Sequence, residues 1–378
     1  MHTPTQAADM NALPRSANTD TRMRLQDVSR GYQSSVVLLT ACHLGVFDAL
    51  GDNPRAAAGP AQTPAALAAA GPAQAPAAPA AAGPAQTPTA LAAALRLDPR
   101  ALEIVLLALA SDGFLKRSAE GFRLSEDYAP YLLSGGAQTQ ASILRHNYNC
   151  LRRWCQLEEV VRTGQPAPRE DEGPEDMRAF ICGMADISRL SSAETADKLD
   201  LSPYRRMLDV GGGPGTAAIE FARRNPAMRC VVFDLEGPIG IAREEIRKAG
   251  LADRIETRVG DYFRDELGSE PGEGFDLVYV SNIIHSMGPA DTRMLFGKSH
   301  RALVPGGTLI VKDFFLEDDR ITPNTAALFS VNMLVGTEQG RSYTLSETRA
   351  MLEEMGFADF RAIEVATASR LLIAHKTA

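Results

Sequence analysis

The pattern of apolar and polar positions divides the 378-residue chain into a helical first part and a later part in which strands alternate with helices. Apolar residues recur at helical spacing over 22–50, and a strongly amphipathic helix is predicted over 99–112. A two-stranded hairpin is expected at 114–124, directly after that helix. Further helices are predicted over 138–163 and 174–199. Helices followed by a hairpin favour a unit of winged-helix type.

The later part carries short runs rich in aliphatic and β-branched residues, which are typical of buried strands. Five such runs alternate with helical segments, and this order predicts a parallel sheet with crossover helices. These runs are 206–210, 229–234, 255–259, 276–281 and 307–312. Two more, 361–366 and 370–375, are separated by too few residues for a helix, so they should form an antiparallel hairpin at the sheet edge. The pattern predicts an α/β fold with a doubly wound sheet.

Two segments fall outside these patterns. Residues 1–20 are polar and are predicted to be disordered. The string GPAQ begins at positions 59, 71 and 83, which marks a twelve-residue repeat. Proline and glycine interrupt any helix there, and Ala-Pro tracts build no core. We therefore expect the low-complexity segment 52–86 to be a mobile insert with no catalytic duty.

These boundaries suggest three structured parts. A helical, winged-helix-like domain is expected over 21–135, interrupted by the alanine-proline insert. A helical linker that also supplies pocket helices is expected over 136–200, and the sheet domain over 201–378.

The most informative motif is MLDVGGGPG at Met207–Gly215, which follows the first predicted sheet strand. Glycines leave no side chain between the backbone and a ligand, and they accept the positive φ angles of a tight turn. A dinucleotide fingerprint is G-x-G-x-x-G, but here the third glycine comes one residue early and Thr216 takes its place. No Gly-Lys-Ser/Thr follows, which excludes a P-loop. Asp234 ends the next strand, where its carboxylate would bind a ribose diol.

The composition of the chain argues against several classes of binding partner. The formal net charge of −8 argues against nucleic acid, and the would-be recognition helix carries only Arg100 among aliphatic residues. The five cysteines lack disulfide or zinc spacing, and no metal-ligand cluster is evident. No signal peptide and no run of eighteen apolar residues is present. We expect a cytoplasmic protein that contacts neither membrane nor nucleic acid.

Six ordered markers together resemble one family: LDVGGGPG, VVFDL, GDYF, FDLVYVSNIIH, PGGTLIVKD and FSVNMLVGTEQGRSYTLSE before EMGF. From about residue 22 to the C-terminus, apart from the insert, the chain is similar to the S-adenosylmethionine-dependent small-molecule O-methyltransferases. These act in bacterial secondary metabolism, plant phenylpropanoid pathways and melatonin synthesis. The resemblance implies a Rossmann-like class I methyltransferase sheet and S-adenosylmethionine as cofactor. It also implies that the helical domain forms an intertwined homodimer and roofs the substrate pocket.

The resemblance assigns a cofactor site at the carboxyl ends of the strands. Asp234 would hold the ribose hydroxyls and Asp261 would accept the adenine amino hydrogen, while Tyr262, with Phe263, would stack on the adenine face. The implied cofactor-binding residues are Gly211, Gly213, Asp234, Leu235, Asp261, Tyr262, Phe263 and Ser281.

The implied chemistry depends on His285, which matches the general base of the family, and on Asp313, which would orient it. A phenol, with a pKa of about 10, is mostly protonated at neutral pH, and an imidazole with a pKa near 6.5 can remove its proton during attack. Alignment of acceptor, methyl and sulfur can supply roughly 7–11 kcal/mol. The implied acceptor is a hydroxyl of a small aromatic molecule. Candidate acceptor-binding residues are Trp154, Phe180, Met184, Asn332 and Met333, with Met287 and His146 as further pocket candidates. The sequence is equally consistent with a place in the core for Trp154, Phe180, Met184 and Met287.

The chain departs from the family pattern at two positions. Ser286 and Ser342 stand where plant members carry carboxylates. Either His285 with Asp313 suffices, or the acceptor is already acidic, or the scaffold performs C- or carboxyl-methylation or a reaction without methyl transfer. A further alternative is a ligand-sensing regulator that uses the winged helix.

Overall fold

The computed structural model describes residues 17–51, 81–134, 136, 138–168, 174–268, 274–365 and 369–377. The described residues divide into two compact units, one formed by those up to 129 and the other by those from 130 onwards. The division at 129/130 falls close to the expected boundary at 135.

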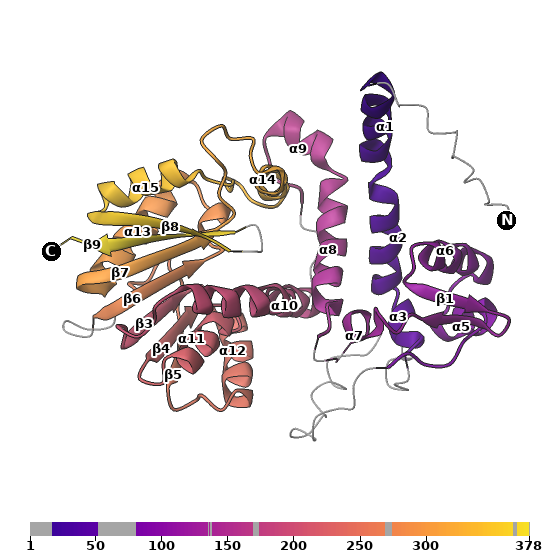
Figure 1. Cartoon of the computed structure of the whole chain (residues 1–378), viewed down its shortest axis with the longest axis horizontal. Helices are drawn as coiled ribbons and strands as arrows, with labels where there is room; N and C mark the ends of the chain where they lie inside the picture. Colours follow the sequence, from indigo (N-terminus) through magenta and orange to yellow (C-terminus); the bar gives the residue numbers. More distant parts are fainter. Residues whose placement is uncertain are drawn as a thin grey trace, which may run out of the picture. The chain divides into compact units, whose positions relative to one another are not determined.

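The first unit is helical with a small hairpin (Figure 1), and two of its helices begin at side-chain caps. Thr87 and Asp98 each accept a hydrogen bond from the backbone three residues later and precede a proline at the first helical position. Gly113, at φ +84°, ends the second of these helices. The elements are α1 (Ala17–Arg30), α2 (Tyr32–His43), α3 (Val46–Ala49), α5 (Pro88–Leu95), α6 (Pro99–Ser111), β1 (Leu115–Ser118) and β2 (Gly121–Leu124).

The segment that the repeat pattern predicts to be mobile, 52–86, extends too far at its C-terminal end. Residues 52–80 lie outside the described part of the chain, but 81–86 lie within it. Gln86 exchanges two backbone hydrogen bonds with Phe122, at 2.8 and 2.9 Å, and its side chain donates to the Ala49 carbonyl at 2.6 Å. The prediction of a mobile segment up to residue 86 is therefore wrong for 81–86, because the last GPAQ copy pairs with the hairpin.

The second unit contains a seven-stranded sheet with helices on both faces (Figure 1). Its helices are α8 (Ala141–Trp154), α9 (Leu157–Thr163), α10 (Pro174–Lys198), α11 (Thr216–Arg224), α12 (Glu236–Lys248), η1 (Ile284–Ser286), α13 (Pro289–Ala302), α14 (Asn324–Gly336) and α15 (Leu345–Glu354). Its strands are β3 (Arg206–Val210), β4 (Arg229–Asp234), β5 (Ile255–Val259), β6 (Phe275–Ser281), β7 (Leu303–Asp313), β8 (Phe357–Glu364) and β9 (Arg370–Lys376). Helix α7 (Ala129–Leu132) stands at the division between the two units.

The strand order is β5-β4-β3-β6-β7-β9-β8, with β3 to β7 parallel and β9 antiparallel to both of its neighbours. The predicted parallel sheet and the C-terminal edge hairpin are confirmed. The order of strands along the chain reverses between β3 and β6, and ligands of doubly wound sheets bind outside the carboxyl ends of the strands at such a point.

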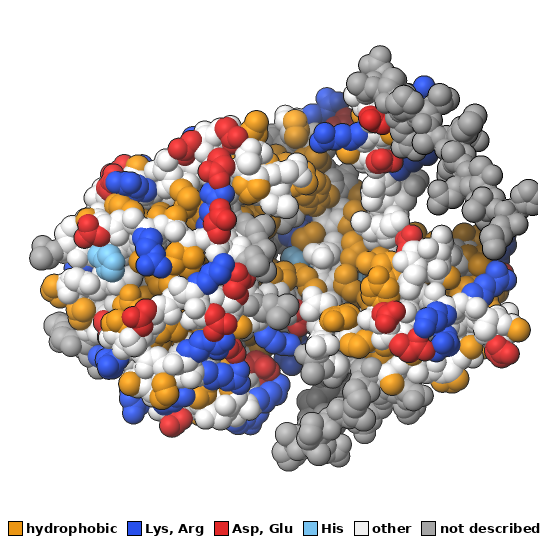
Figure 2. All heavy atoms as spheres, viewed as in Figure 1, with side chains coloured by type: hydrophobic (Ala, Val, Ile, Leu, Met, Phe, Trp, Pro, Cys, Tyr) orange, Lys and Arg blue, Asp and Glu red, His pale blue; other side chains and the backbone are white. Residues whose placement is uncertain are grey.

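Apolar side chains cover both faces of this sheet. Residues of α13 and α15 pack on one face, and residues of α10, α11 and α12 pack on the other. On the surface visible in Figure 2, Lys and Arg side chains of this unit are interspersed with Asp and Glu rather than gathered into one basic patch. The sheet is thus a rigid, doubly covered platform whose carboxyl edge presents the loops described next.

Candidate active site

The glycine turn joins β3 to α11 and is tied to the neighbouring strand. Gly211, at φ +63°, donates its N–H to the Phe233 carbonyl at 2.8 Å. A side chain at Gly211 would place its Cβ 2.4 Å from Ile283 Cδ1, which would have to shift, and the positive φ itself favours glycine there. Gly213, at φ +54°, would place a Cβ in open space, with nothing within 4 Å. The turn therefore leaves room for a ligand above Gly213.

The carboxylate of Asp234 lies against this turn. Its Oδ2 accepts the Gly213 N–H at 2.8 Å and its Oδ1 accepts the Leu235 N–H at 2.7 Å. Each oxygen accepts only one hydrogen bond among the described residues, and a carboxylate oxygen can accept a second. Burial raises the pKa of Asp234 above its usual value. The side chain is fixed in direction, and each oxygen keeps a lone pair that could accept a hydrogen bond from a ligand.

A second carboxylate, that of Asp209, lies beneath the same turn. Its side chain is only 1% exposed, and Oδ2 has no hydrogen-bond partner among the residues that the structure describes. Burial and the charge of Asp234 raise the pKa of Asp209 to about 7. Sequence reasoning gave this residue of the motif no role in the site. Its position two residues before Gly211, near the end of the strand, was the signal that could have placed it in the site.

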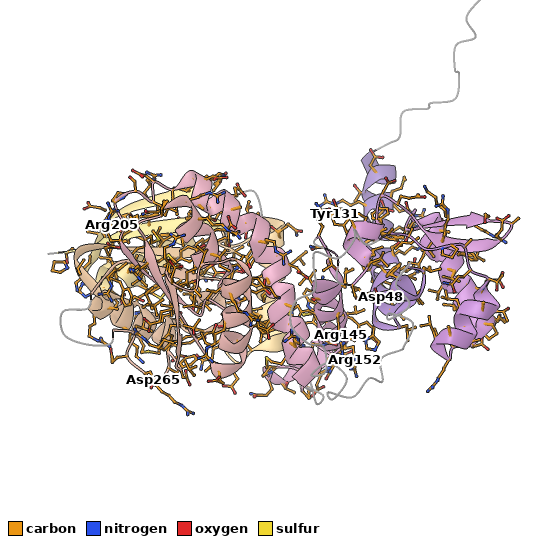
Figure 3. All side chains as sticks on the ribbon, turned by 90° about the horizontal axis from the view of Figure 1, so that it is seen from below. Asp48, Tyr131, Arg145, Arg152, Arg205 and Asp265 are labelled. Atoms are coloured by element: carbon orange, nitrogen blue, oxygen red, sulfur yellow. The ribbon has the colours of Figure 1, made fainter. Side chains whose placement is uncertain are left out.

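The segment after β5 presents an acid and two aromatic rings. Asp261 accepts the Phe263 N–H at 2.9 Å and donates its own N–H to Asp265 at 2.8 Å; Asp265 is labelled in Figure 3. The rings of Tyr262 and Phe263 lie 4.8 Å apart. Tyr262 lies beside the glycine turn, and burial raises its pKa to about 12, whereas Phe263 is 48% exposed. Tyr262 is thus the ring adjoining the turn, and Phe263 the more accessible one.

His285 and Asp313 meet at the carboxyl ends of β6 and β7. The imidazole Nδ1 lies 2.7 Å from Asp313 Oδ1, and the His285 backbone N–H donates to Oδ2 at 3.3 Å. Oδ1 also accepts the Phe314 N–H at 2.8 Å, which fixes the carboxylate. Exposure of the two side chains is 13% and 4%. With its Nδ1–H held by the carboxylate, a neutral imidazole carries its lone pair on Nε2.

Two phenylalanines form an aromatic wall beside the imidazole. The Phe329 ring meets the His285 ring edge-on, with centroids 4.8 Å apart, and Phe314 stacks against Phe329 at 4.4 Å. Sequence reasoning missed both residues. Phe314 follows Asp313 directly. Phe329 lies one helical turn before Asn332, which the family resemblance had indicated, so helical spacing from Asn332 could have found it.

The predicted acceptor-binding residues do not all lie together in the structure. Asn332 on α14 accepts a hydrogen bond from the Trp154 indole on α8 at 2.8 Å, whereas Met333, next to it, is buried. Phe180 lies on α10 with its ring 5.1 Å from that of His146, and Met184 follows one turn later. Met287, a further pocket candidate, lies instead in the apolar core of the sheet.

Comparison with known proteins decides the family. The model of the O-methyltransferase domain matches residues 163–358, and that of the O-methyltransferase dimerisation domain matches 26–132. The 3-hydroxy-5-methyl-1-naphthoate 3-O-methyltransferase of Streptomyces sahachiroi is 31% identical, with 91% of each chain covered.

This chain belongs to the O-methyltransferase family.

It is a class I enzyme that depends on S-adenosylmethionine. Bovine acetylserotonin O-methyltransferase (Bos taurus) is 29% identical to it, over 89% of this chain and 92% of that protein. The structure of human N-acetylserotonin methyltransferase in complex with S-adenosylmethionine superposes with a TM-score of 0.75 at 24% identity, covering 96% of this chain and 100% of that one. At that identity the superposition shows the fold, which is the Rossmann-like sheet expected from the sequence.

The residues of this O-methyltransferase fit its cofactor. Gly213 faces open space, Asp234 keeps accepting lone pairs, and an aromatic ring adjoins the turn, as a ribose and an adenine require. Within the described ranges, no three His, Cys, Asp or Glu side chains are grouped to hold a metal ion. Nor does any helix in that part of the chain have the length and apolarity to span a bilayer.

The two serines that replace plant carboxylates are held away from the imidazole of the O-methyltransferase. Ser286 donates its hydroxyl to the Ile283 carbonyl at 2.8 Å. Ser342 is buried and donates to the Ala326 carbonyl at 2.9 Å, which ties its loop to α14. In the described structure, Asp313 is therefore the one carboxylate bonded to His285.

Proposed function

We propose that this enzyme methylates a hydroxyl of a small aromatic molecule, with His285 as general base and Asp313 as the group that orients it. The proposal is carried by the 2.7 Å contact between His285 Nδ1 and the buried Asp313 carboxylate. That contact fixes one tautomer and aims the basic Nε2 away from the carboxylate.

S-adenosylmethionine, when bound, supplies a methyl group activated by a positively charged sulfur. The work of the protein is then to position the acceptor and to remove its proton. Nε2 of His285 accepts the hydroxyl proton while the acceptor oxygen attacks, and the imidazole becomes cationic. Asp313 stabilises that cation across a charge-assisted hydrogen bond. Without flanking carboxylates at 286 and 342, this one pair carries the whole proton transfer.

We assign the cofactor to the loops after β3, β4, β5 and β6. Asp234 would accept the ribose hydroxyls, Asp261 would accept the adenine amino hydrogen, and Tyr262 would cover the adenine ring. The cofactor-binding residues proposed are Gly211, Gly213, Asp234, Leu235, Asp261, Tyr262, Phe263 and Ser281.

The acceptor class is supported by the relatives and by the lining of the site. The relatives named above act on a hydroxynaphthoate and on acetylserotonin, both of which carry an aromatic hydroxyl. Phe314 and Phe329 form an aromatic wall beside the base, which suits a flat ring. A polyketide- or amino-acid-derived aromatic secondary metabolite fits both observations.

A homodimer is proposed on two grounds. The first unit matches the dimerisation domain of the family. Its helices α1 and α2 expose large apolar side chains, with Leu25 70%, Val28 74% and Tyr32 61% exposed. Apolar side chains gathered in this way on a helical surface mark a protein interface. Analytical ultracentrifugation of the full chain tests it, with Val28→Glu expected to shift the protein towards monomer.

The test of the activity uses S-adenosylmethionine labelled in its methyl group and a panel of phenols. We expect a labelled product with a new O-methyl ether, and a loss of about 10²–10⁴ in turnover for His285→Ala with cofactor affinity nearly unchanged. His43→Ala, an exposed histidine in the other unit, is the matched control. A label found on carbon or on a carboxylate, or turnover that His285→Ala leaves unchanged, would contradict the assignment.

A further inference from the structure

One hydrogen bond joins two helices beside the base. Trp154, near the C-terminal end of α8, donates its indole N–H to Asn332 Oδ1 on α14 at 2.8 Å, across 178 residues of sequence. Trp154 is the only tryptophan of the chain. It packs against the buried apolar cluster of Val160, Ala167 and Val335, and these contacts hold its side chain in place.

The chemistry of the indole decides which way the amide faces. An indole N–H can only donate, so the atom of Asn332 that faces Trp154 must be the carbonyl oxygen. The amide nitrogen, which carries two N–H donors, then points away from Trp154. Asn332 is partly exposed, and among the described residues nothing accepts a hydrogen bond from this nitrogen. The Asn332 amide could present either its oxygen or its NH₂ group to a ligand. Because the oxygen is bonded to Trp154, only the two N–H donors remain for a ligand.

These donors lie on the face of α14 that borders the base. Phe329 is one helical turn before Asn332, and residues three apart on a helix are neighbours, with Cβ atoms about 5–6 Å apart. The Phe329 ring is in edge contact with the His285 imidazole at 4.8 Å. An aromatic ring whose hydroxyl reaches His285 Nε2 would pass along Phe329, and its next substituent would meet Asn332.

We propose that Trp154 is a positioning residue that fixes Asn332 as a donor, and that the enzyme thereby selects acceptors with a hydrogen-bond-accepting oxygen beside the methylated hydroxyl. Such an oxygen belongs to an ether, a ketone or a carboxylate. A neighbouring group without an acceptor atom would leave the amide donors without a partner on binding, which is costly. This inference rests on the proposed function, since it concerns the acceptor of the same site.

The test compares two acceptors of matched shape, 2-methoxyphenol and 2-ethylphenol. The wild-type enzyme should favour the ether by about tenfold in kcat/KM, or about 1.4 kcal/mol. Asn332→Asp keeps an oxygen for the Trp154 N–H but replaces the donors with a second acceptor, so the preference should reverse. Trp154→Phe keeps a ring but frees the amide to rotate, so the ratio of kcat/KM for the two acceptors should fall towards one.

Binding is measured separately from turnover. The fluorescence of the single tryptophan reports acceptor binding to the wild type and to Asn332→Asp in the presence of S-adenosylhomocysteine, and calorimetry does so for Trp154→Phe. A binding preference for the ether without any methylation would sustain this inference and defeat the proposed function. Equal preference in the wild type, or a preference that both variants retain, would overturn the inference even if methylation proceeds.

Discussion

Replacing Asp313 with asparagine probes the base most directly, because the side chain keeps its shape and loses its charge. Oδ1 accepts from both His285 Nδ1 and the Phe314 N–H, and Oδ2 accepts from the His285 backbone. An asparagine with its oxygen at Oδ1 would set its NH₂ against the His285 backbone N–H. The opposite orientation would donate to Nδ1 and put the imidazole proton on Nε2, the wrong tautomer for a base. Either orientation impairs proton removal.

The size of the effect follows from burial and distance. The two side chains are 13% and 4% exposed, so solvent screens their interaction weakly. Two unit charges about 4 Å apart at an effective dielectric constant near 20 attract by about 4 kcal/mol. This attraction develops as His285 takes the proton, so most of it is lost from the transition state. A loss of about 3–4 kcal/mol corresponds to roughly 10²–10³ in kcat.

The assay measures kcat with labelled methyl donor for a series of phenols of increasing acidity. Because a more acidic phenol needs less help from a base, the penalty of Asp313→Asn should shrink along the series. Affinity for S-adenosylhomocysteine, measured by calorimetry, should stay within a few-fold of wild type. Asp253→Asn, an exposed aspartate before β5, is the matched control and should have no effect.

One result would refute this reasoning. If Asp313→Asn retained wild-type kcat with a weakly acidic phenol, the carboxylate would not stabilise the imidazolium. Proton removal would then be unimportant, which corresponds to the alternative of an already acidic acceptor. A penalty equal for all phenols would instead indicate a purely structural role for Asp313.

Three further predictions concern the two aspartates at the glycine turn and the alanine-proline insert. Asp234→Asn should weaken S-adenosylhomocysteine binding by about tenfold or more in calorimetry, whereas the exposed neighbour Glu236→Gln should not. The raised pKa of Asp209 means that the folded state holds this proton more tightly than the unfolded state, so stability falls as pH rises from about 4 to about 7. Asp209→Asn removes that loss and should raise the urea unfolding free energy at pH 8, but not at pH 3, by up to about 4 kcal/mol; an unchanged pH dependence would disprove it. Deleting 63–86 sets the GPAQ of 59–62 directly before Thr87 and so restores a glutamine at the position of Gln86. The melting temperature of this deletion variant should therefore match that of the wild type. Gln86→Pro removes the backbone N–H that bonds to the Phe122 carbonyl, so this variant should melt several degrees lower.

Local signals carried most of the fold. The glycine turn and the β-strand runs depend on residues a few positions apart, and both were predicted from the sequence. The prediction that the repeat is mobile up to residue 86 was wrong at its C-terminal end. A low-complexity sequence does not reveal that one of its copies pairs with a hairpin distant in the chain. The pairing of Gln86 with Phe122 is a tertiary contact.

The candidate site was only partly predictable from the sequence. His285 and Asp313 were each predicted from their motifs, yet their contact spans 28 residues and depends on β6 and β7 lying side by side. Phe314 and Phe329 were missed, since an aromatic residue in an apolar run does not show what it faces. Met287 followed the motif equally well and proved to be core.

The sequence by itself determined the order of elements, the glycine turn and the set of candidate polar side chains, because these follow from periodicity and backbone conformation within short windows. Tertiary structure alone decided three things: that Asp209 is buried beneath the turn, that the serines at 286 and 342 face backbone carbonyls, and that Trp154 fixes the amide of Asn332. Each depends on which surfaces pack together, and packing is set by the whole fold rather than by any one segment.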